Sequence, residues 1–488
     1  MQQLSYAQKE AIGFNYVLDC LRPASPYGQE LVRNLTPFSK GQEQELLRQL
    51  QNIQKVVEAH PQVTEQQNRL LRILMRTKML RPTAKKCLEA DLNEIELFEL
   101  KRFLLQSWEI LPLWQDLQAI WALECVPFAD TQAALDILDP QKNRVAAFFL
   151  EDSRSPLLHQ LRQEKRDLEA ALREQNCVDR DGLQARRSHI AAREEQEEIR
   201  IRHELSVALR PYISAILSNM DVLGELDFTL EKARLATQCG GVLPKLTESE
   251  IVMQDMLQPQ LADRLGAQGK CFTPISIALE PGAAVVTGAN MGGKSVALKT
   301  LALNLYLIHC GIFPFAKTAA APLFDSFHIL AEDKSSLEQG LSSFGGEIVS
   351  FNEIIRAVDQ GFAFVLLDEF ARGTNPQEGA ALVQAVTQYL NSRQVIAVLA
   401  THYDQVAPYG NVHYQVVGLR DMNPESVVRE LAGLQGREGV DVITKYMNYG
   451  LYRLQGESSC PKDAFRICQL LGMKQEILSL AEKTQKKS

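Results

Sequence analysis

The chain has 488 residues, of which 45% are hydrophobic and 23% charged, so it is long enough for two or three domains with cores of their own. Its net charge of −8 excludes a bulk basic surface of the kind that non-specific nucleic-acid binders carry, although a local basic patch remains open. The nine cysteines form no CxxC pair and no Cys/His cluster at zinc spacing, which argues against a structural metal and favours reduced thiols.

The chain begins Met-Gln-Gln-Leu-Ser-Tyr, without the basic region and apolar run of a signal peptide. No stretch approaches the roughly 20 apolar residues that a membrane span needs. We therefore expect a cytoplasmic protein with no membrane partner.

Residues 1 to about 240 have the apolar spacing of helices. Leu46, Leu50 and Ile53, for example, repeat at steps of three and four residues. Prolines such as Pro61 and Pro112 are expected to separate one helix from the next. This pattern predicts a helical domain over residues 1–240.

One part of that domain, about residues 155–210, is rich in Arg, Glu, Gln and Leu. A leucine seam, a turn at Asp179–Gly182 and a second long helix ending before Pro211 predict an antiparallel helical hairpin. Its acidic and basic residues roughly balance. This balance favours a solvated coiled-coil arm over a dedicated DNA-contacting arm, and both interpretations stay open. The seam consists of Leu158, Leu161, Leu168 and Leu172.

After Gly240-Gly241, short apolar runs alternate with helical patterns. Residues 284–286, 364–367 and 395–399 are typical of buried parallel strands. We expect an α/β domain with a mostly parallel sheet over 241–430, followed by a helical segment over 431–488. The predicted fold class is thus α plus α/β, with several domains.

The run from Gly288 to Ser295 has the pattern of a P-loop between a strand and a helix. Gly288, Gly292 and Gly293 would let backbone N–H groups turn toward phosphate oxygens at the helix N-terminus. Lys294 would reach the β- and γ-phosphates, and the Ser295 hydroxyl would bind Mg²⁺. The run therefore predicts a site for ATP with Mg²⁺.

Polar side chains also follow the next two predicted strands. Asp368, at the end of the run 364–367, is placed to hold the Mg²⁺ shell, and Glu369 to polarise an attacking water. His402 follows the run 395–399 and could sense the γ-phosphate or orient the water. Taken singly, a histidine at a strand end is more often a packed or capping residue.

These motifs together resemble the ATPase domain of the MutS family. The resemblance rests on four segments: Thr287-Gly-Ala-Asn-Met-Gly-Gly-Lys-Ser295, Gly340-Leu-Ser-Ser-Phe344, Asp368-Glu-Phe-Ala-Arg-Gly-Thr374 and Ala400-Thr-His-Tyr403. It continues more weakly through Asn448-Tyr-Gly-Leu451 and toward the C-terminus, where the family carries a helix-turn-helix dimerisation element. The resemblance implies an ABC-type ATPase that acts as a homodimer.

The resemblance also implies roles for individual residues. Asn290, beside Met291 in the loop, would contact the phosphates or the attacking water, while Glu369 would be the catalytic carboxylate and His402 the γ-phosphate sensor. Ser342, or less well aligned Ser343, would act on the partner subunit's ATP. Phe272 resembles an aromatic residue that stacks on adenine, but a lone phenylalanine fits core packing equally well.

The chain departs from the family pattern at several points. Ala289 replaces a proline, and Phe370-Ala371 replaces an aliphatic–glycine pair, but neither change removes a catalytic atom. We expect the mismatch-reading domain and the nuclease domain to be absent and the clamp domain to be reduced to a turn, where Arg180, Arg186 and Arg187 cluster. Mismatch reading is therefore in doubt.

Two functions follow from the resemblance. The first is an ATP-driven dimeric switch that associates with DNA, as in mismatch repair or recombination. The second is an ATPase that remodels a protein client, such as the reactivating partner of a cobalamin-dependent aminomutase, which the acidic charge and the missing clamp favour. A scaffold with an inactive ATPase fits poorly, because Lys294, Asp368, Glu369 and His402 are all present.

Overall fold

The computed structural model describes residues 3–147, 150–173, 179–288, 293–331, 343–419, 427, 448–454, 468–470 and 473–485. The chain divides into two compact units that interleave in sequence. The sheet unit comprises Met1–Leu21, Leu35–Val57 and Lys232–Ser488, and the helical unit comprises Arg22–Asn34 and Glu58–Glu231. Two N-terminal segments therefore fold with the sheets, although their own pattern is helical.

The helical unit confirms the helical prediction for this part of the chain. Two long helices, α4 (Glu43–Leu74) and α10 (Ile213–Cys239), contribute residues to both units. The other elements are α3 (Pro26–Arg33), α5 (Arg81–Glu89), α6 (Glu94–Trp121), α7 (Gln132–Leu138), η1 (Asp152–Arg154), α8 (Pro156–Arg173), α9 (Arg180–Leu209) and η2 (Arg210–Tyr212).

The prediction that Pro61 and Pro112 separate helices is wrong. Pro61 lies inside α4 and Pro112 inside α6. A proline removes one helical hydrogen bond and strains the preceding turn, at a cost of about 3 kcal/mol. On α6 that cost is offset by a long buried face that continues on both sides of the proline, with Phe103, Ile110 and Leu117 all nearly inaccessible.

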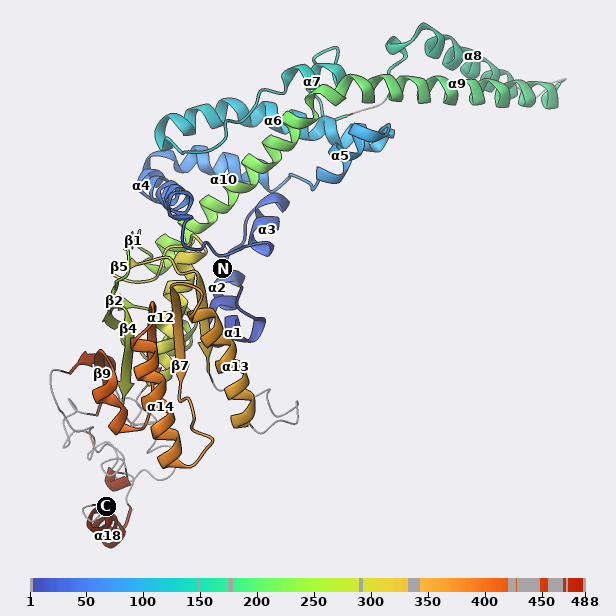
Figure 1. Cartoon of the computed structure of the whole chain (residues 1–488). Helices are drawn as coiled ribbons and strands as arrows, with labels where there is room; N and C mark the ends of the chain where they lie inside the picture. The colour runs from blue at the N-terminus through green and yellow to red at the C-terminus, as the bar shows by residue number, and fades with distance from the viewer. Residues whose placement is uncertain are drawn as a thin grey trace. The chain divides into compact units, whose positions relative to one another are not determined.

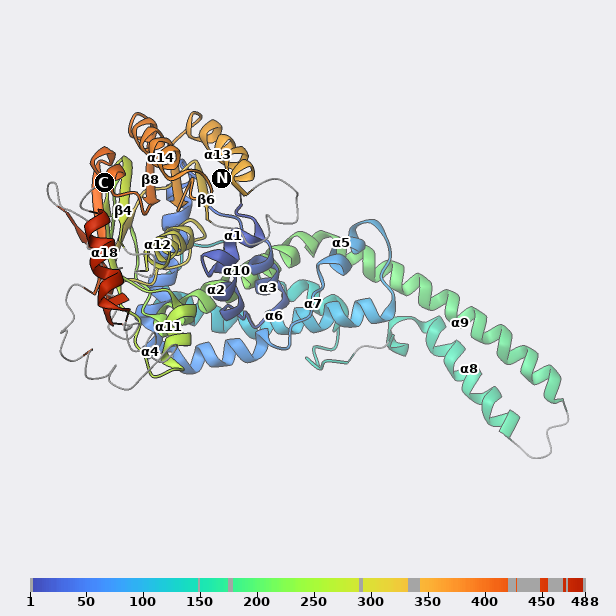
Figure 2. The same cartoon turned by 90° about the horizontal axis from the view of Figure 1, so that it is seen from below.

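The predicted hairpin is present as α8 and α9, which run side by side in two perpendicular views (Figures 1 and 2). In the leucine seam Leu158 and Leu161 are buried, and Leu168 and Leu172 are half-buried. The expected turn over Asp179–Gly182 is wrong in its placement, because α9 already begins at Arg180. Asp179 is its N-cap, and its carboxylate accepts a 3.0 Å hydrogen bond from the Gly182 N–H.

The sheet unit contains a six-stranded sheet in the order β10-β9-β4-β8-β7-β6. All neighbouring pairs except β9 and β10 are parallel. The three expected strands are β4, β7 and β8, each buried along its whole length. The bounds are β4 (Gly282–Thr287), β6 (Ser326–Leu330), β7 (Ala363–Asp368), β8 (Val395–Ala400), β9 (Val412–Gly418) and β10 (Asn448–Arg453).

Helices cover both faces of this sheet, as Figure 2 shows, with α13 and α14 on one side of the strands and α12 on the other. Alternate strand residues such as Val285, Val365 and Ala397 point to α13 and α14 and form one core with them. The helices of the sheet unit are α1 (Tyr6–Ala11), α2 (Phe14–Cys20), α11 (Pro259–Gly266), α12 (Lys294–His309), α13 (Ser343–Val358), α14 (Pro376–Asn391), η4 (Asp404–Tyr409) and α18 (Gln475–Gln485).

A second, four-stranded sheet has the order β1-β5-β2-β3. Strand β2 pairs antiparallel with both β3 and β5, and β1 pairs parallel with β5. Its strands are β1 (Lys245–Leu246), β2 (Ile251–Met256), β3 (Ile275–Leu279) and β5 (Thr318–Ala321).

The expected helical segment over 431–488 is wrong at one point. Asn448–Arg453 forms β10, which pairs antiparallel with β9. The edge of β9 offers unpaired backbone groups, and the run Tyr449-Gly-Leu-Tyr452 contains residues that favour strands. The expected helix start at Pro461 lies outside the described residues, and α18 is helical. None of the described helices is long and apolar enough to span a membrane.

Candidate active site

The predicted P-loop connects β4 to α12. Gly288 follows the buried strand with φ of +139°, and Gly293 is the N-cap of α12 with φ of +87°. Both values lie in the region that favours glycine. Between them Ala289, Asn290, Met291 and Gly292 lie outside the described residues, so their predicted contacts with phosphate stay predictions. The strand–loop–helix context that a P-loop requires is present.

Lys294 is the first residue of α12, and its side chain is only 3% exposed. Its Nζ donates a 2.7 Å hydrogen bond to the Gly288 carbonyl and lies 3.9 Å from Glu369 Oε1. A buried ammonium needs acceptors around it, and here the Gly288 carbonyl and the Glu369 carboxylate supply them. The lysine is therefore held at the position from which it could meet a phosphate.

Ser295 and Asp368 lie side by side, and the Ser295 hydroxyl donates a 3.0 Å hydrogen bond to Asp368 Oδ1. Burial raises the pKa of the Asp368 carboxyl above its ordinary value, while the Ser295 hydrogen bond and Lys299 oppose this shift. Such a hydroxyl–carboxylate pair fits Mg²⁺, which prefers oxygen ligands and takes one or two from protein beside phosphates and waters. No cluster of three or more metal-binding side chains occurs among the described residues, so the nucleotide would have to complete the coordination.

Glu369 follows Asp368 in a left-handed conformation, with φ of +57°. Its N–H donates to the Ala400 carbonyl at 3.0 Å, which ties it to the end of β8. Its carboxylate accepts a 2.6 Å hydrogen bond from Arg372 Nη1. A non-glycine residue with positive φ is uncommon, and such residues cluster at functional sites.

His402 lies just beyond β8, at the same sheet edge as Asp368, because Asp368 pairs with Ala400 in the register of β7 and β8. Partial burial lowers the pKa of His402 below its ordinary value, although the Glu369 carboxylate opposes the shift. The lowered pKa favours the neutral imidazole at pH 7. The structure thus brings Lys294, Ser295, Asp368 and Glu369 together, with His402 near them.

Three predicted residues are not placed against this cluster. Ser342 lies outside the described residues, and of Ser343 only the backbone, at the start of α13, is described. Phe272 is half-buried in the loop before β3, and its stacking on adenine stays a prediction.

Four further residues contact the site or its backbone, and the sequence analysis gave none of them a role. Arg372, Tyr403 and Tyr449 lie within the segments that carry the family resemblance. Arg372 pairs with Glu369, and a Cβ built at Gly293 would overlap the ring of Tyr449 from β10. Glu347 and Tyr403 bond the backbone two residues after Glu369. Their positions depend on the packing of separate elements, so residue spacing could not reveal them.

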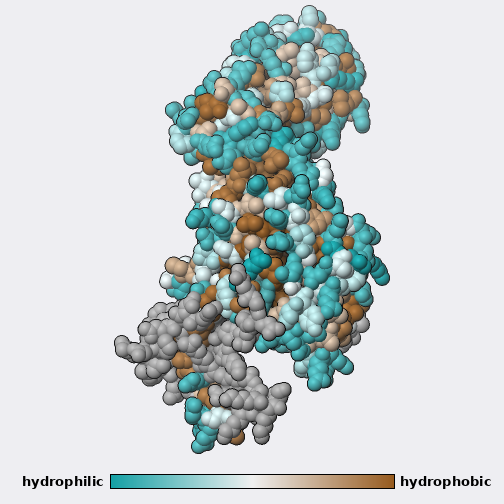
Figure 3. All heavy atoms as spheres, turned by 60° about the vertical axis from the view of Figure 1, so that its left-hand side comes forward, coloured by the Kyte–Doolittle hydropathy of each residue, from teal (hydrophilic) through white to brown (hydrophobic). Residues whose placement is uncertain are grey.

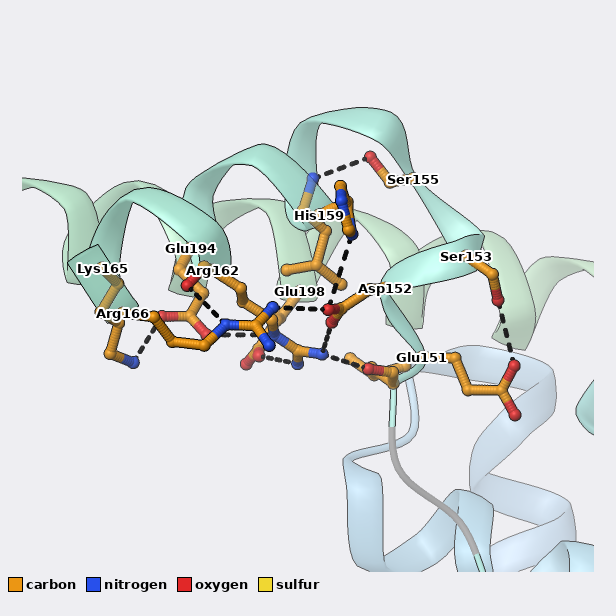
Figure 4. Close-up of polar contacts among 12 residues, drawn as sticks. Glu151, Asp152, Ser153, Ser155, His159, Arg162, Lys165, Arg166, Glu194 and Glu198 are labelled. Carbon is orange, nitrogen blue, oxygen red and sulfur yellow. Dashed lines mark hydrogen bonds and ion pairs between the residues drawn. The ribbon is translucent and has the colours of Figure 1, made fainter.

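The base of the α8–α9 hairpin is a network of ion pairs (Figure 4). The Arg162 guanidinium donates to Asp152 at 2.7 Å, to Glu198 at 2.9 Å and to Glu194 at 3.1 Å. These carboxylates raise the pKa of Arg162 against the opposing effect of its partial burial. Lys165 and Arg166 add further pairs with Glu194 and Asp152. The basic residues at the base of the hairpin are therefore paired with neighbouring carboxylates.

The arginine cluster at the start of α9 is only partly available to a polyanion. Arg187 pairs with Glu169 of α8 at 2.7 Å. Arg180 and Arg186 are exposed and form no ion pair with any residue that the structure describes. The Arg187–Glu169 pair favours a solvated arm over a dedicated DNA-contacting one. Figure 3 shows another face of the molecule, on which hydrophilic and hydrophobic residues are mixed.

Part of the sequence is similar to known proteins. Residues 284–435 match MutS domain V. Endonuclease MutS2 of Levilactobacillus brevis is 35% identical over 218 residues, which are 44% of this chain and 27% of that protein. Endonuclease MutS2 of Leuconostoc citreum is 30% identical over 271 residues, or 54% and 33% of the two chains. The chain thus matches a third or less of the length of these curated relatives.

Proposed function

This chain belongs to the MutS family, and on that premise we propose that its P-loop site binds ATP with Mg²⁺ and hydrolyses it to ADP and phosphate. The observation that carries the proposal is the Ser295–Asp368 hydrogen bond of 3.0 Å beside buried Lys294 and Glu369. A partly buried hydroxyl–carboxylate pair next to a lysine at a helix N-terminus has the chemistry of a nucleotide–magnesium site.

Each group has a role that its position supports. Gly288 and Gly293, with Asn290, Met291 and Gly292 between them, would surround the phosphates, and Lys294 would neutralise the β- and γ-phosphates. Ser295 and Asp368 would hold Mg²⁺, which supplies charge neutralisation for the phosphate oxygens. The Ser295 hydroxyl donates to Asp368 in the structure and would instead turn its lone pairs to the ion.

Glu369 is the group we propose as general base for the attacking water. Its carboxylate lies 3.9 Å from Lys294 Nζ, close to where the γ-phosphate would be held. Asn290 would contact the phosphates or this water. Neutral His402 could accept or donate one hydrogen bond to the water or the γ-phosphate, which suits a sensor of the nucleotide state.

We further propose that two copies of the chain form the working unit. Ser342 would reach the nucleotide of the partner subunit, so that ATP closes the dimer and hydrolysis releases it. Phe272 would stack on the adenine. Such a dimer would couple the nucleotide state to movement of the helical unit.

For the client of this switch, DNA is the first candidate, because the similar proteins are named for an endonuclease of the MutS type. That name describes the relatives, of which a third or less is matched here. A protein client, such as a cobalamin-dependent aminomutase, is the second candidate. It is favoured by the net charge of −8 and by the Arg187–Glu169 pair, which removes one positive charge from the proposed DNA-contacting cluster.

A Glu369→Gln variant tests the ATPase proposal. We expect ATP binding close to that of the parent and a turnover that is lower by about 100-fold or more, because the amide cannot accept the proton from water. Glu353→Gln, an exposed position on α13, is the control and should keep parental turnover. Parental turnover in Glu369→Gln would contradict the role of Glu369, and a parent that neither binds nor hydrolyses ATP would contradict the function.

The two clients can be separated with the same variant. Locked with ATP, Glu369→Gln should capture duplex or branched DNA at low salt, and Arg180→Gln with Arg186→Gln should weaken that capture. Capture of a protein without DNA, unaffected by the two arginines, would favour the protein client.

A further inference from the structure

Ala371 lies two residues after Glu369, is fully buried and has φ of +60°. This left-handed conformation favours glycine, and Glu369 itself has φ of +57°. Non-glycine residues keep such a conformation only where the surrounding contacts hold them. The contacts of Ala371 therefore also fix the backbone from which the Glu369 carboxylate projects.

The N–H of Ala371 is held by α13. It donates to both carboxylate oxygens of Glu347, at 3.3 Å and 3.2 Å. The same helix packs against the residue between Glu369 and Ala371, since the rings of Phe351 and Phe370 lie 4.8 Å apart. A charged acceptor forms a stronger hydrogen bond with a backbone N–H than a neutral one does.

The carbonyl of Ala371 is held from the other side by the segment that carries His402. The hydroxyl of Tyr403 donates to the Ala371 carbonyl at 3.3 Å, and both groups are buried. Gly379 on α14 makes room for this contact, because a Cβ there would overlap the Tyr403 hydroxyl and lie 2.8 Å from the Ala371 carbonyl oxygen. The Tyr403 backbone is itself fixed, because its N–H donates to Thr401 Oγ1 at 3.1 Å.

We propose that Glu347 and Tyr403 are positioning residues for ATP hydrolysis, which hold Ala371 by its N–H and its carbonyl and so keep Glu369 in its working conformation. Neither side chain touches the nucleotide in this role; both act through the backbone of Ala371. The inference rests on the proposed ATPase function. Through these two hydrogen bonds, α13 and the segment after β8 both contact the loop after β7 that carries Glu369.

The test uses the full chain and compares Glu347→Ala and Tyr403→Phe with the parent. We expect kcat for ATP to fall by about 10- to 100-fold in each, since small displacements of a catalytic group have effects of this size. The affinity for a non-hydrolysable ATP analogue should stay within about two-fold, because Lys294, Ser295 and Asp368 are unchanged. Controls are Glu353→Gln, at an exposed position of α13, and Tyr389→Phe, at a half-buried position of α14 whose hydroxyl donates to Asp359.

A rescue variant separates positioning from simple loss of packing. Ala371→Gly adopts φ of +60° without strain, so adding it to Glu347→Ala should restore at least about half of the lost kcat on a logarithmic scale. If Glu347→Ala acted only by loosening the packing, the further loss of the Ala371 methyl group would lower kcat again. Hydrogen exchange of a peptide covering residues 369–373 should be faster in Glu347→Ala than in the parent and in Glu353→Gln.

The outcomes are distinct. Parental kcat in both variants, an equal loss of nucleotide affinity, or no rescue by Ala371→Gly would each overturn the proposal. A parent chain without ATPase activity would overturn the proposed function and the positioning role with it. In that case unchanged exchange at residues 369–373 in Glu347→Ala would show, independently of hydrolysis, that the contacts do not hold the loop.

Discussion

The Ser295 hydroxyl donates a 3.0 Å hydrogen bond to Asp368 Oδ1 and thereby joins the first turn of α12 to the end of β7. The two residues are 73 positions apart in the chain. Strand β8 lies between β4 and β7, so the contact spans the sheet edge over the intervening strand. Five predictions concern this site and the hairpin.

Asp368→Asn should abolish the dependence of ATP affinity on Mg²⁺, because the amide has no charge for the ion. ATP titrations with Mg²⁺ and with EDTA measure this dependence. The parent should bind ATP more tightly with Mg²⁺, by about ten-fold or more. The exposed Asp359→Asn is the matched control. An equal gain from Mg²⁺ in Asp368→Asn and the parent would contradict the assignment.

The same variant should melt at a higher temperature than the parent at pH 7. Burial raises the pKa of Asp368, so the folded state binds the proton more tightly than the unfolded chain does. The stabilisation is present at pH below the unfolded value of 3.8 and is lost as the pH rises through the raised folded value. Asparagine removes the buried charge, and each 1 kcal/mol regained would appear as about 2–4 °C. A lower melting temperature would mean that the charge is stabilising.

Gly293→Ala should destroy nucleotide binding and destabilise the sheet unit. Its φ of +87° is costly for alanine, by about 1–3 kcal/mol, and the new methyl group would overlap the ring of Tyr449. Gly269→Ala isolates the backbone effect, since φ there is +71° and no atom lies within 4 Å of the added Cβ. Denaturant unfolding should show a loss of stability in Gly293→Ala, and ATP titration should show a loss of binding in Gly293→Ala but not in Gly269→Ala. Equal effects of the two substitutions on ATP binding would contradict the predicted role of the loop.

His402 predicts a pH profile for hydrolysis. Partial burial lowers its pKa below 6.5, so turnover should be unaffected by His402 between pH 8 and pH 7 and should fall only at pH below 6.5, as the ring gains a charge beside Lys294 and Arg372. His402→Asn should be slower than the parent by about ten-fold and should lack this acid limb. Measurements of kcat from pH 5 to pH 8 test it. An acid limb that persists unchanged in His402→Asn belongs to another group.

Arg162→Gln should destabilise the hairpin by about 2–3 kcal/mol, because it leaves three carboxylates close together without their shared cation. Arg186→Gln, at an exposed position of α9 without an ion pair to any described residue, should change stability by less than about 0.5 kcal/mol. Urea unfolding followed by circular dichroism compares the two. Similar midpoints would show that the network contributes little.

Much of the site was predictable because its determinants are local. Gly288 and Gly293 bracket a loop between an apolar run and a helix. Asp368 and His402 each follow a short apolar run that is typical of a buried strand. Parallel strands present their carboxyl ends at one edge, so these groups had to lie near one another. The class of the sheet unit followed from the same alternation of strands and helices.

Other features depend on which elements pack together. The pattern around Pro61 and Pro112 indicates helix ends, but burial of the flanking faces keeps α4 and α6 continuous. The run at Asn448–Arg453 becomes a strand because β9 offers it an edge. Residues 1–21 and 35–57 join the sheet unit although their own pattern is only that of helices.

The sequence by itself predicted the P-loop, the strand-end carboxylates and the resemblance to the MutS family, because glycine positions and polar residues at strand ends can be recognised from neighbouring residues. Only the tertiary structure decided that Glu347 and Tyr403 hold Ala371, since they bond its backbone from 24 and 32 residues away. Every residue type except proline offers the same backbone N–H and carbonyl, so the identity of Ala371 does not indicate which side chains bond to it. The connection from α13 to Glu369 therefore exists only once the chain has folded.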